Sequence, residues 1–371
     1  LLFSLGTLSL TGLLFILLIS ILRWLSYDGI FVEYNLYIFL IICVTFFQSY
    51  VQQFVRSIDK VKVYVVSGVV LTLTTVLSSL IFLPLWGIDG YIYSMILSYF
   101  VAAIYTVIAG KECSYFSLSL LSKKQLKEML KYSIPMIPNS IMWWVLSTLN
   151  RPLLEYYSGI DSVGILAVAN KFPMIIAMVY SVFTYSWQIS VLEEFKDISY
   201  NFFYNKIFRL LFLVLICFLL GITILGRPLV KLMTTSGYNE AWKYVSVLSL
   251  AVVFSNLSGF VGTNFLATKE SKYYFSTSVW GGTVCLISNF LLIPLLGIWG
   301  AVISILISNI LMFSLRVKIT WKYAPIFDWC SYMIIFLIVV IYILVNIFVS
   351  DIFIDIFCVC ILLCVILRFN R

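Results

Sequence analysis

Long apolar runs, separated by short polar turns, follow one another along the whole chain. Each run has roughly 20 residues, the length that a helix needs to cross a ~30 Å hydrocarbon core. The pattern predicts about 12 membrane-spanning helices, at 4–25, 35–55, 63–84, 88–109, 132–157, 161–190, 207–226, 245–266, 273–295, 298–316, 330–350 and 352–368. An open sheet cannot satisfy its backbone in lipid, and the runs lack the alternation of a barrel. The sequence therefore predicts an all-α polytopic membrane protein.

Composition supports this class of protein and argues against metal-binding, cofactor-binding and enzymatic functions. The chain has 371 residues, of which 63% are hydrophobic and 11% are charged, and it has no histidine. A soluble domain carries about 25% charged residues. The loops are too short to hold a folded domain, and Cys358, Cys360 and Cys364 are best interpreted as small apolar residues of the last span. We expect no metal, no cofactor and no enzymatic activity.

Lysine and arginine gather at alternate helix ends, which sets the orientation, because such residues are enriched on the cytoplasmic side. The larger set is Arg56, Lys60, Lys62, Lys111, Lys123, Lys124, Lys127, Lys131, Lys196, Lys206, Arg209, Lys269, Lys272, Arg316, Lys318, Lys322, Arg368 and Arg371. The smaller set is Arg23, Arg151, Arg227, Lys231 and Lys243. We predict that the larger set and both ends of the chain are cytoplasmic. The net charge of +8 then reflects membrane topology and not nucleic-acid binding.

One stretch of the chain occurs twice. LPLWGIDGYIYSMILS (Leu83–Ser98) returns as IPLLGIWGAVISILIS (Ile293–Ser308). Aligned without a gap, the matching pairs are Lys62/Lys272, Tyr64/Tyr274, Ser78/Ser288, Pro84/Pro294, Gly87/Gly297, Gly90/Gly300, Ser94/Ser304 and Ser98/Ser308. Proline and glycine predict a tight turn between two spans. The small residues after the turn share one helix face and let another helix approach closely.

The repeat predicts two lobes. An even number of spans separates the copies, so they have the same orientation, as in transporters built from parallel six-helix units. We expect an incomplete N-terminal lobe of four helices at 1–110, which lacks about two N-terminal helices. A basic cytoplasmic linker helix at 111–131, a six-helix lobe at 132–321 and two further helices at 322–371 follow.

The segment that opens the second lobe resembles a known family. KYSIPMIPNSIMWWVLSTLNRPLLEYYSGIDSVGILAVANKFP, from Lys131, has a Pro-x-x-Pro helix start, an arginine near the helix end, and a Val-Gly-Ile turn followed by Ala-x-Lys and Pro. QFVRSIDKVKVYVVSG (Gln53–Gly68) is similar as well. Both resemble polysaccharide flippases, of O-antigen or capsule type, in the multidrug/oligosaccharidyl-lipid/polysaccharide exporter superfamily. This chain has Asn150 where the family often has Asp, and Asn170 where it often has an aromatic residue.

Two cations of this segment lie within predicted spans. Arg151 is expected ~9 Å below the outer boundary and Lys171 ~15 Å deep. A charge at the membrane centre costs about 2.5–3.5 kcal/mol on insertion scales. In a structural interpretation, Arg151 pairs with Glu155 and Lys171 with a carboxylate or helix-end carbonyls. In a functional one, both cations line an aqueous cavity and bind an anion. Pro173 is expected to break the helix beside Lys171.

The resemblance implies a function for such a cavity. The substrate would be an undecaprenyl-pyrophosphate-linked oligosaccharide that crosses the bacterial inner membrane by alternating access, driven by H⁺ or Na⁺. Arg151 and Lys171 would bind the pyrophosphate. The sugar hydroxyls would meet Asn139, Asn150, Asn170 and Gln188, and Glu33 and Glu155 are the candidates for ion coupling. A multidrug exporter of the same superfamily and a non-transporting polymerase or scaffold of glycan assembly remain as alternatives.

Overall fold

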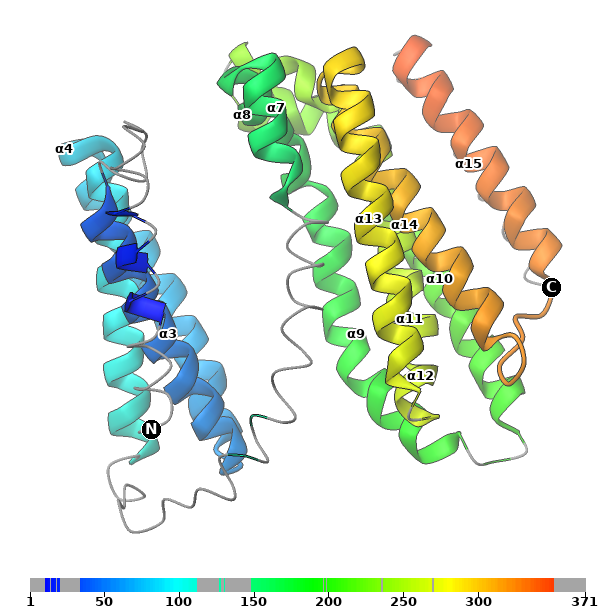
Figure 1. The fold of residues 1–371 in the computed structure, drawn as a ribbon, viewed down its shortest axis with the longest axis horizontal. Coiled ribbons are helices and arrows are strands. Elements are labelled where there is room, and N and C mark those ends of the chain that lie inside the picture. Colours follow the sequence, from blue (N-terminus) through cyan, green and yellow to red (C-terminus); the bar gives the residue numbers. More distant parts are fainter. Residues whose placement is uncertain are drawn as a thin grey trace. The chain divides into compact units, whose positions relative to one another are not determined.

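A computed structural model shows that the chain is helical, with no strand in the part that it describes. That part comprises residues 11–13, 15–17, 19–20, 34–111, 127, 130, 148–195, 197, 199–234, 236–268 and 270–349. Seven helices in these ranges are long and apolar enough to cross a membrane, or up to eight if a bent pair counts as one span. The predicted all-α polytopic class is confirmed. The chain divides into two compact units, Leu1–Lys131 and Tyr132–Arg371 (Figure 1).

Unit 1 contains α3 (Asn35–Ser57) and the long α4 (Val61–Gly110). The predicted spans 63–84 and 88–109 both lie in α4, which is broken at Gly87 (φ 58°, ψ −129°). The two halves fold back on each other at this break. A hydrogen bond of 2.7 Å between the hydroxyls of Ser67 and Thr106 joins them. α3 joins this hairpin through a 3.0 Å hydrogen bond between the hydroxyls of Tyr37 and Tyr93.

Unit 2 is a helical bundle with short connections (Figure 1). Its elements are α7 (Asn150–Ser158), α8 (Ile160–Lys171), α9 (Pro173–Glu194), α10 (Tyr200–Met233), the 3₁₀ turn η4 (Ser236–Ala241), α11 (Trp242–Gly262), α12 (Asn264–Ala267), α13 (Ser271–Leu296), α14 (Ile298–Thr320) and α15 (Trp329–Val349). We call the end that holds Gly159 and Gly297 the turn end. The opposite end, which holds Asn264 and Tyr323, is the basic end.

The core of unit 2 is built around α11, the most buried of the described spanning helices. Aromatic rings fill it towards the basic end. The rings of Trp187 and Phe260 stack with their centroids 4.3 Å apart, and the Trp187 indole N–H donates a 2.7 Å hydrogen bond to Thr263. Phe336 of α15 stacks on Phe254 of α11 at 4.5 Å. Stacked rings combine a large buried area with a fixed geometry, so this cluster holds α9, α11 and α15 together.

The repeated motif has the same backbone in both units. Gly297 (φ 58°, ψ −125°) separates α13 from α14 as Gly87 separates the halves of α4. A Cβ at Gly90 would overlap the carbonyl oxygen of Phe82, and one at Gly300 would overlap that of Leu292. Both the predicted turn and the predicted close approach are therefore confirmed.

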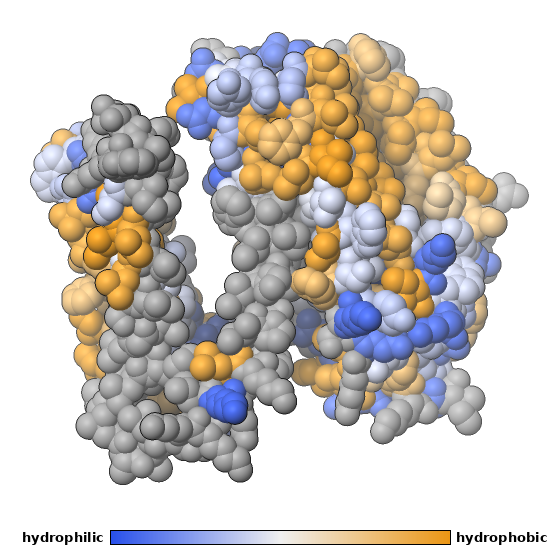
Figure 2. Space-filling model, viewed as in Figure 1, coloured by the Kyte–Doolittle hydropathy of each residue, from blue (hydrophilic) through white to orange (hydrophobic). Residues whose placement is uncertain are grey.

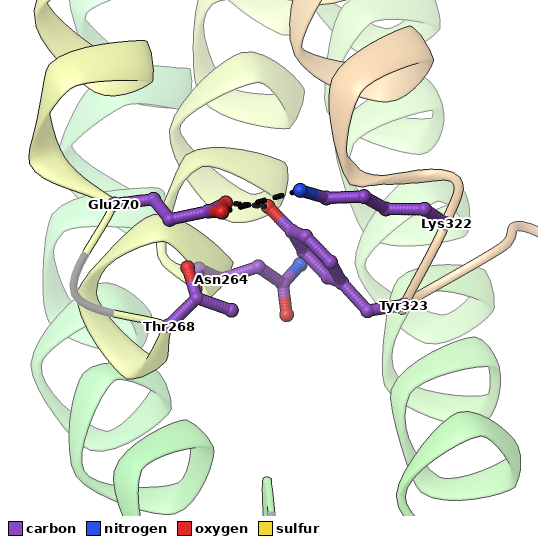
Figure 3. Close-up of polar contacts among 5 residues, drawn as sticks. All are labelled: Asn264, Thr268, Glu270, Lys322 and Tyr323. Atoms are coloured by element: carbon purple, nitrogen blue, oxygen red, sulfur yellow. Dashed lines mark hydrogen bonds and ion pairs between the residues drawn. The ribbon is translucent and has the colours of Figure 1, made fainter.

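Polar residues tie the connections at the basic end together (Figure 3). Lys322 and Glu270 form an ion pair of 3.2 Å, and the hydroxyl of Tyr323 donates to the other carboxylate oxygen at 3.4 Å. Burial, with the nearby Glu270 carboxylate, raises the pKa of Tyr323 to about 12, so that this phenol stays protonated as a donor. The contacts join the start of α13 to the segment between α14 and α15.

The surface of unit 2 matches a membrane environment. Apolar side chains cover most of the upper half of this unit in Figure 2, and strongly hydrophilic ones gather near its lower end. Such a band is expected where helices meet lipid. The predicted spans 4–25 and 352–368, the linker at 111–131 and the first part of 132–157 lie wholly or largely outside the described residues.

Candidate functional site

The site begins at the hairpin between α7 and α8. α7 ends at Ser158, and Gly159 reverses the chain with φ 82° and ψ 168°, a conformation that favours glycine. The N–H of Gly159 donates a 3.0 Å hydrogen bond to the carbonyl of Glu155. The hairpin expected between the first two spans of the second lobe is therefore present at the turn end.

A bend follows directly after Lys171. The axes of α8 and of the first part of α9 differ by 43° across Phe172. Pro173 is the first residue of α9, where its missing N–H costs no hydrogen bond within α9 but ends the ladder of α8. The helix break predicted beside Lys171 is confirmed, and it places this cation at a corner of the chain.

Lys171 lies on the side of its helix that faces away from the core of unit 2. Ala169, Phe172 and Ile176 are buried on the opposite side. The exposed side continues along α9 with Met174 (62% exposed), Met178 (72%) and Val182 (74%). Lys171 itself is exposed and forms no hydrogen bond or ion pair with the described residues. A solitary cation thus lies in line with an apolar helix face, well inside a predicted span.

Arg151 and Glu155 both lie exposed on α7. The ion pairs within the described ranges are Lys243–Glu240 and Lys322–Glu270, so the pairing of Arg151 with Glu155 that the structural interpretation requires is not formed. The guanidinium of Arg151 therefore lies at the turn end without a carboxylate partner in the described part of unit 2.

Three amides expected to contact sugars lie in different surroundings. Asn150 is only 3% exposed, and its Oδ1 has no hydrogen-bond partner. Asn170 is half-buried and donates to the carbonyl of Leu166 at 3.0 Å. Gln188 is also half-buried, but it lies roughly 25 Å along the helix from Lys171. Asn170 therefore adjoins Lys171 along the helix, with its amide bound to the backbone of α8, and Gln188 lies far from both. Asn139 and Glu33 lie outside the described residues.

A further buried cation was not expected as a site residue. Arg316 of α14 is 0% exposed. Its Nε donates to Thr277 Oγ1 (3.1 Å), one terminal nitrogen to the carbonyl of Ser258 (2.9 Å) and the other to Ser278 Oγ (3.0 Å). The ring of Tyr274 lies 4.3 Å from the guanidinium carbon. No carboxylate among the described residues pairs with it.

The repeat contained a signal for Arg316. The gapless alignment places Arg316 opposite Thr106, and Thr277 opposite Ser67. A cation therefore replaces a hydroxyl at this position, in a helix whose pattern otherwise matches its counterpart. The lysine and arginine distribution alone gave Arg316 no role beyond that of a cytoplasmic charge.

The charges inside the described spans of unit 2 have one sign. Its carboxylates lie within a few residues of a helix end, as Asp161, Glu193 and Glu194 do, or in η4, as Glu240 does. Lys171 is the last residue of α8 but lies well inside the bent span that α8 forms with α9, and Arg316 lies near the end of α14. In the described part of the chain, no group of three or more Cys, Asp or Glu residues could hold a metal ion.

The helical hairpins, the bent span and the two units define a membrane protein with the fold of a transporter. This chain is similar to a solved structure of the lipid II flippase MurJ in an inward closed conformation. The match covers 99% of this chain and 82% of the MurJ chain, with a TM-score of 0.71 at 15% identity. The MATE transporter VcmN of Vibrio cholerae matches 86% of this chain and 77% of its own (TM-score 0.63, 16% identity). A multidrug resistance MATE family transporter of the MOP superfamily, in an outward-facing conformation, covers 84% and 76% (TM-score 0.58, 16% identity).

The family follows from the sequence. Residues 2–188 match the model of the family described as polysaccharide biosynthesis protein, and the chain belongs to that family. This confirms the resemblance on which the sequence interpretation rested. None of the curated proteins matches the chain in sequence.

Proposed function

We propose that this chain is a flippase that moves a lipid-linked oligosaccharide with an undecaprenyl-pyrophosphate head across the bacterial inner membrane. The two lobes, at 1–110 and 132–321, would alternate access to a binding site without covalent chemistry. The linker at 111–131 and both ends of the chain would be cytoplasmic. Family membership supports a role in polysaccharide synthesis. One protein of this fold is a flippase of lipid II, which supports a lipid-linked substrate.

The observation that carries the proposal is the position of Lys171. A lone ammonium in line with an apolar helix face is unfavourable in lipid, and from ~15 Å depth it cannot easily reach the boundary. An anionic headgroup that occupies an aqueous cavity at this corner would offset that cost. A pyrophosphate offers several acceptor oxygens for a charge-assisted hydrogen bond. Arg151, towards the turn end, is the second cation of the proposed path.

The amides would recognise the sugar. The unpartnered Oδ1 of Asn150 is a buried acceptor that a hydroxyl could satisfy, and a buried acceptor without a partner costs free energy. Asn170 lies directly beside Lys171, so it would contact the sugar nearest to the pyrophosphate. Asn139 and Gln188 would meet sugar residues further away. H⁺ or Na⁺ is proposed as the coupling ion, with Glu33 and Glu155 as the carboxylates that bind it.

Interior charge distinguishes this proposal from export of cationic drugs. An exporter of cations would need carboxylates in its cavity, whereas the charge well inside the bent span of unit 2 is the cation Lys171. A polymerase or a scaffold would differ in a simpler way, because the purified chain alone would not move lipid-linked sugar between the leaflets of a vesicle.

The test is a flipping assay with the purified full chain in vesicles that contain undecaprenyl-pyrophosphate-linked oligosaccharide. Lys171→Ala and Arg151→Ala are each expected to slow transport about 10- to 100-fold, the equivalent of one hydrogen bond to a charged group. Lys231→Ala removes an exposed cation from the turn end of α10 and serves as the control. Full transport by correctly inserted Lys171→Ala and Arg151→Ala would refute the site.

A further inference from the structure

A groove lies at the turn end of unit 2, between α11, α14 and α15. Its volume is about 530 Å³. Val247 and Leu250 of α11, Trp299 and Ile303 of α14 and Leu344 of α15 are among the residues that line it. Nearly all of the lining is apolar. The aromatic contact between α15 and α11, Phe336 on Phe254, lies nearer the basic end than the groove does.

Lys243 is the charged residue in the lining of this groove. It lies in the first turn of α11, at the mouth of the groove, and its side chain is 37% exposed. Leu250 lies about 10 Å further along the same helix. Lys243 is bound by Glu240 at 3.0 Å, but Glu240 is 66% exposed, and such a surface pair is weak enough for a stronger anion to displace it.

We infer that this groove binds one acyl chain of an anionic phospholipid, with the lipid phosphate on Lys243. A phospholipid has its charge at the membrane boundary and its chain directed inward, which is the order of Lys243 and the apolar lining along α11. A lysine at the mouth of the groove favours a net negative headgroup over a zwitterionic one.

The position of the groove separates it from the proposed transport site. Figure 1 shows α7 and α8, which carry Arg151 and Lys171, on the opposite side of unit 2 from α15. The occupant is therefore a resident membrane lipid and not the transported substrate. The lipid contact itself does not depend on the proposed function, and only its distinction from the transported substrate rests on that function.

The experiment is native mass spectrometry of the full chain, released from membranes that contain equal amounts of phosphatidylglycerol and phosphatidylcholine. The wild type is expected to retain one phosphatidylglycerol. Leu344→Trp fills the groove from a side chain that is 50% exposed, so the bound lipid is expected to be lost. Leu337→Trp adds the same indole to the lipid-facing side of α15, where Leu337 is 62% exposed, and is expected to retain it.

The charge is tested separately. Lys243→Gln is expected to retain a lipid, but its preference for phosphatidylglycerol is expected to fall about fivefold, whereas the exposed Lys231→Gln at the same end keeps that preference.

Equal lipid retention by Leu344→Trp and Leu337→Trp would overturn the groove as the binding site. An unchanged lipid preference in Lys243→Gln would overturn the headgroup contact. Displacement of the bound phosphatidylglycerol by added undecaprenyl pyrophosphate would show that the groove takes the transported class of lipid, which also contradicts the inference. If Leu344→Trp fails to fold, the Lys243→Gln arm decides the inference alone.

Discussion

The hairpin around Gly87 and the hairpin around Gly297 share a backbone but are joined by different chemistry. In unit 1, the two helices are linked by a hydrogen bond between the hydroxyls of Ser67 and Thr106. In unit 2, the corresponding positions are Thr277 and Arg316, and the arginine also binds Ser278 and Ser258. The turn and the small-residue contact therefore define the motif, and the polar pair between its helices is free to change.

The difference shows how a buried charge can be tolerated without a carboxylate. Three neutral oxygens and the face of Tyr274 surround the guanidinium of Arg316, and its planar fork suits several acceptors at once. Because Ser258 belongs to α11, the arginine also fastens this hairpin to the centre of unit 2. The Ser67–Thr106 pair connects the two halves of α4 to each other and to no third helix.

The largest effect is expected where this charged contact is removed. Arg316→Ala should lower the free energy of unfolding by about 3–5 kcal/mol, because three charge-assisted hydrogen bonds are lost while relief of the buried charge offsets a part. Thr106→Ala, its counterpart, should cost about 1 kcal/mol. Unfolding titrations in mixed micelles measure both. Arg316→Thr recreates the pair of unit 1 and should recover a part of the loss. Equal destabilisation by Arg316→Ala and Thr106→Ala would remove the distinction between the hairpins.

The shared turn should respond in the same way in both units. Gly87→Ala and Gly297→Ala each place a side chain at φ 58°, which costs about 1–3 kcal/mol. Gly297→Ala should cost slightly more, because its Cβ would lie 3.3 Å from Ser158 Oγ, whereas Gly87 has no atom within 4 Å. Gly221→Ala in α10, where a Cβ also meets nothing within 4 Å, is the control and should be neutral or stabilising. A neutral Gly87→Ala would show that the turn is not strained.

The smallest effect is expected at the basic end, where unit 2 has an exposed ion pair. Glu270→Gln should cost ~0.2–1 kcal/mol, the usual range for surface pairs.

The pKa of Tyr323 is raised to about 12, so its contribution to stability is complete below about pH 10 and is lost as the pH rises towards 12. The thermal unfolding midpoint of Tyr323→Phe, compared with wild type between pH 9 and pH 11, measures this. A difference between the two proteins that does not shrink at high pH would contradict the assignment.

Much of the fold could be predicted, because hydrophobic runs, proline and glycine act locally. The turn at Gly297 follows from the positive φ that glycine permits, and the break at Pro173 from the hydrogen bond that proline removes. The Val-Gly-Ile turn expected at Gly164 was wrong, because this glycine lies within α8. Long-range contacts were harder to predict. Arg316 looked like a cytoplasmic charge, because its acceptors come from α11 and α13, far away in the sequence. The pairing of Arg151 with Glu155 followed from helix spacing, but spacing permits a contact without requiring it.

Whether Lys171 binds the charged head of the substrate can be tested by changing both partners of the proposed contact. Binding of undecaprenyl-pyrophosphate oligosaccharide is compared with that of the monophosphate analogue, for the wild type and for Lys171→Met. The wild type is expected to prefer the pyrophosphate, and Lys171→Met is expected to lose that preference while it binds the monophosphate nearly as well. An undiminished preference in a correctly folded Lys171→Met would contradict the claim that this lysine recognises the anionic head.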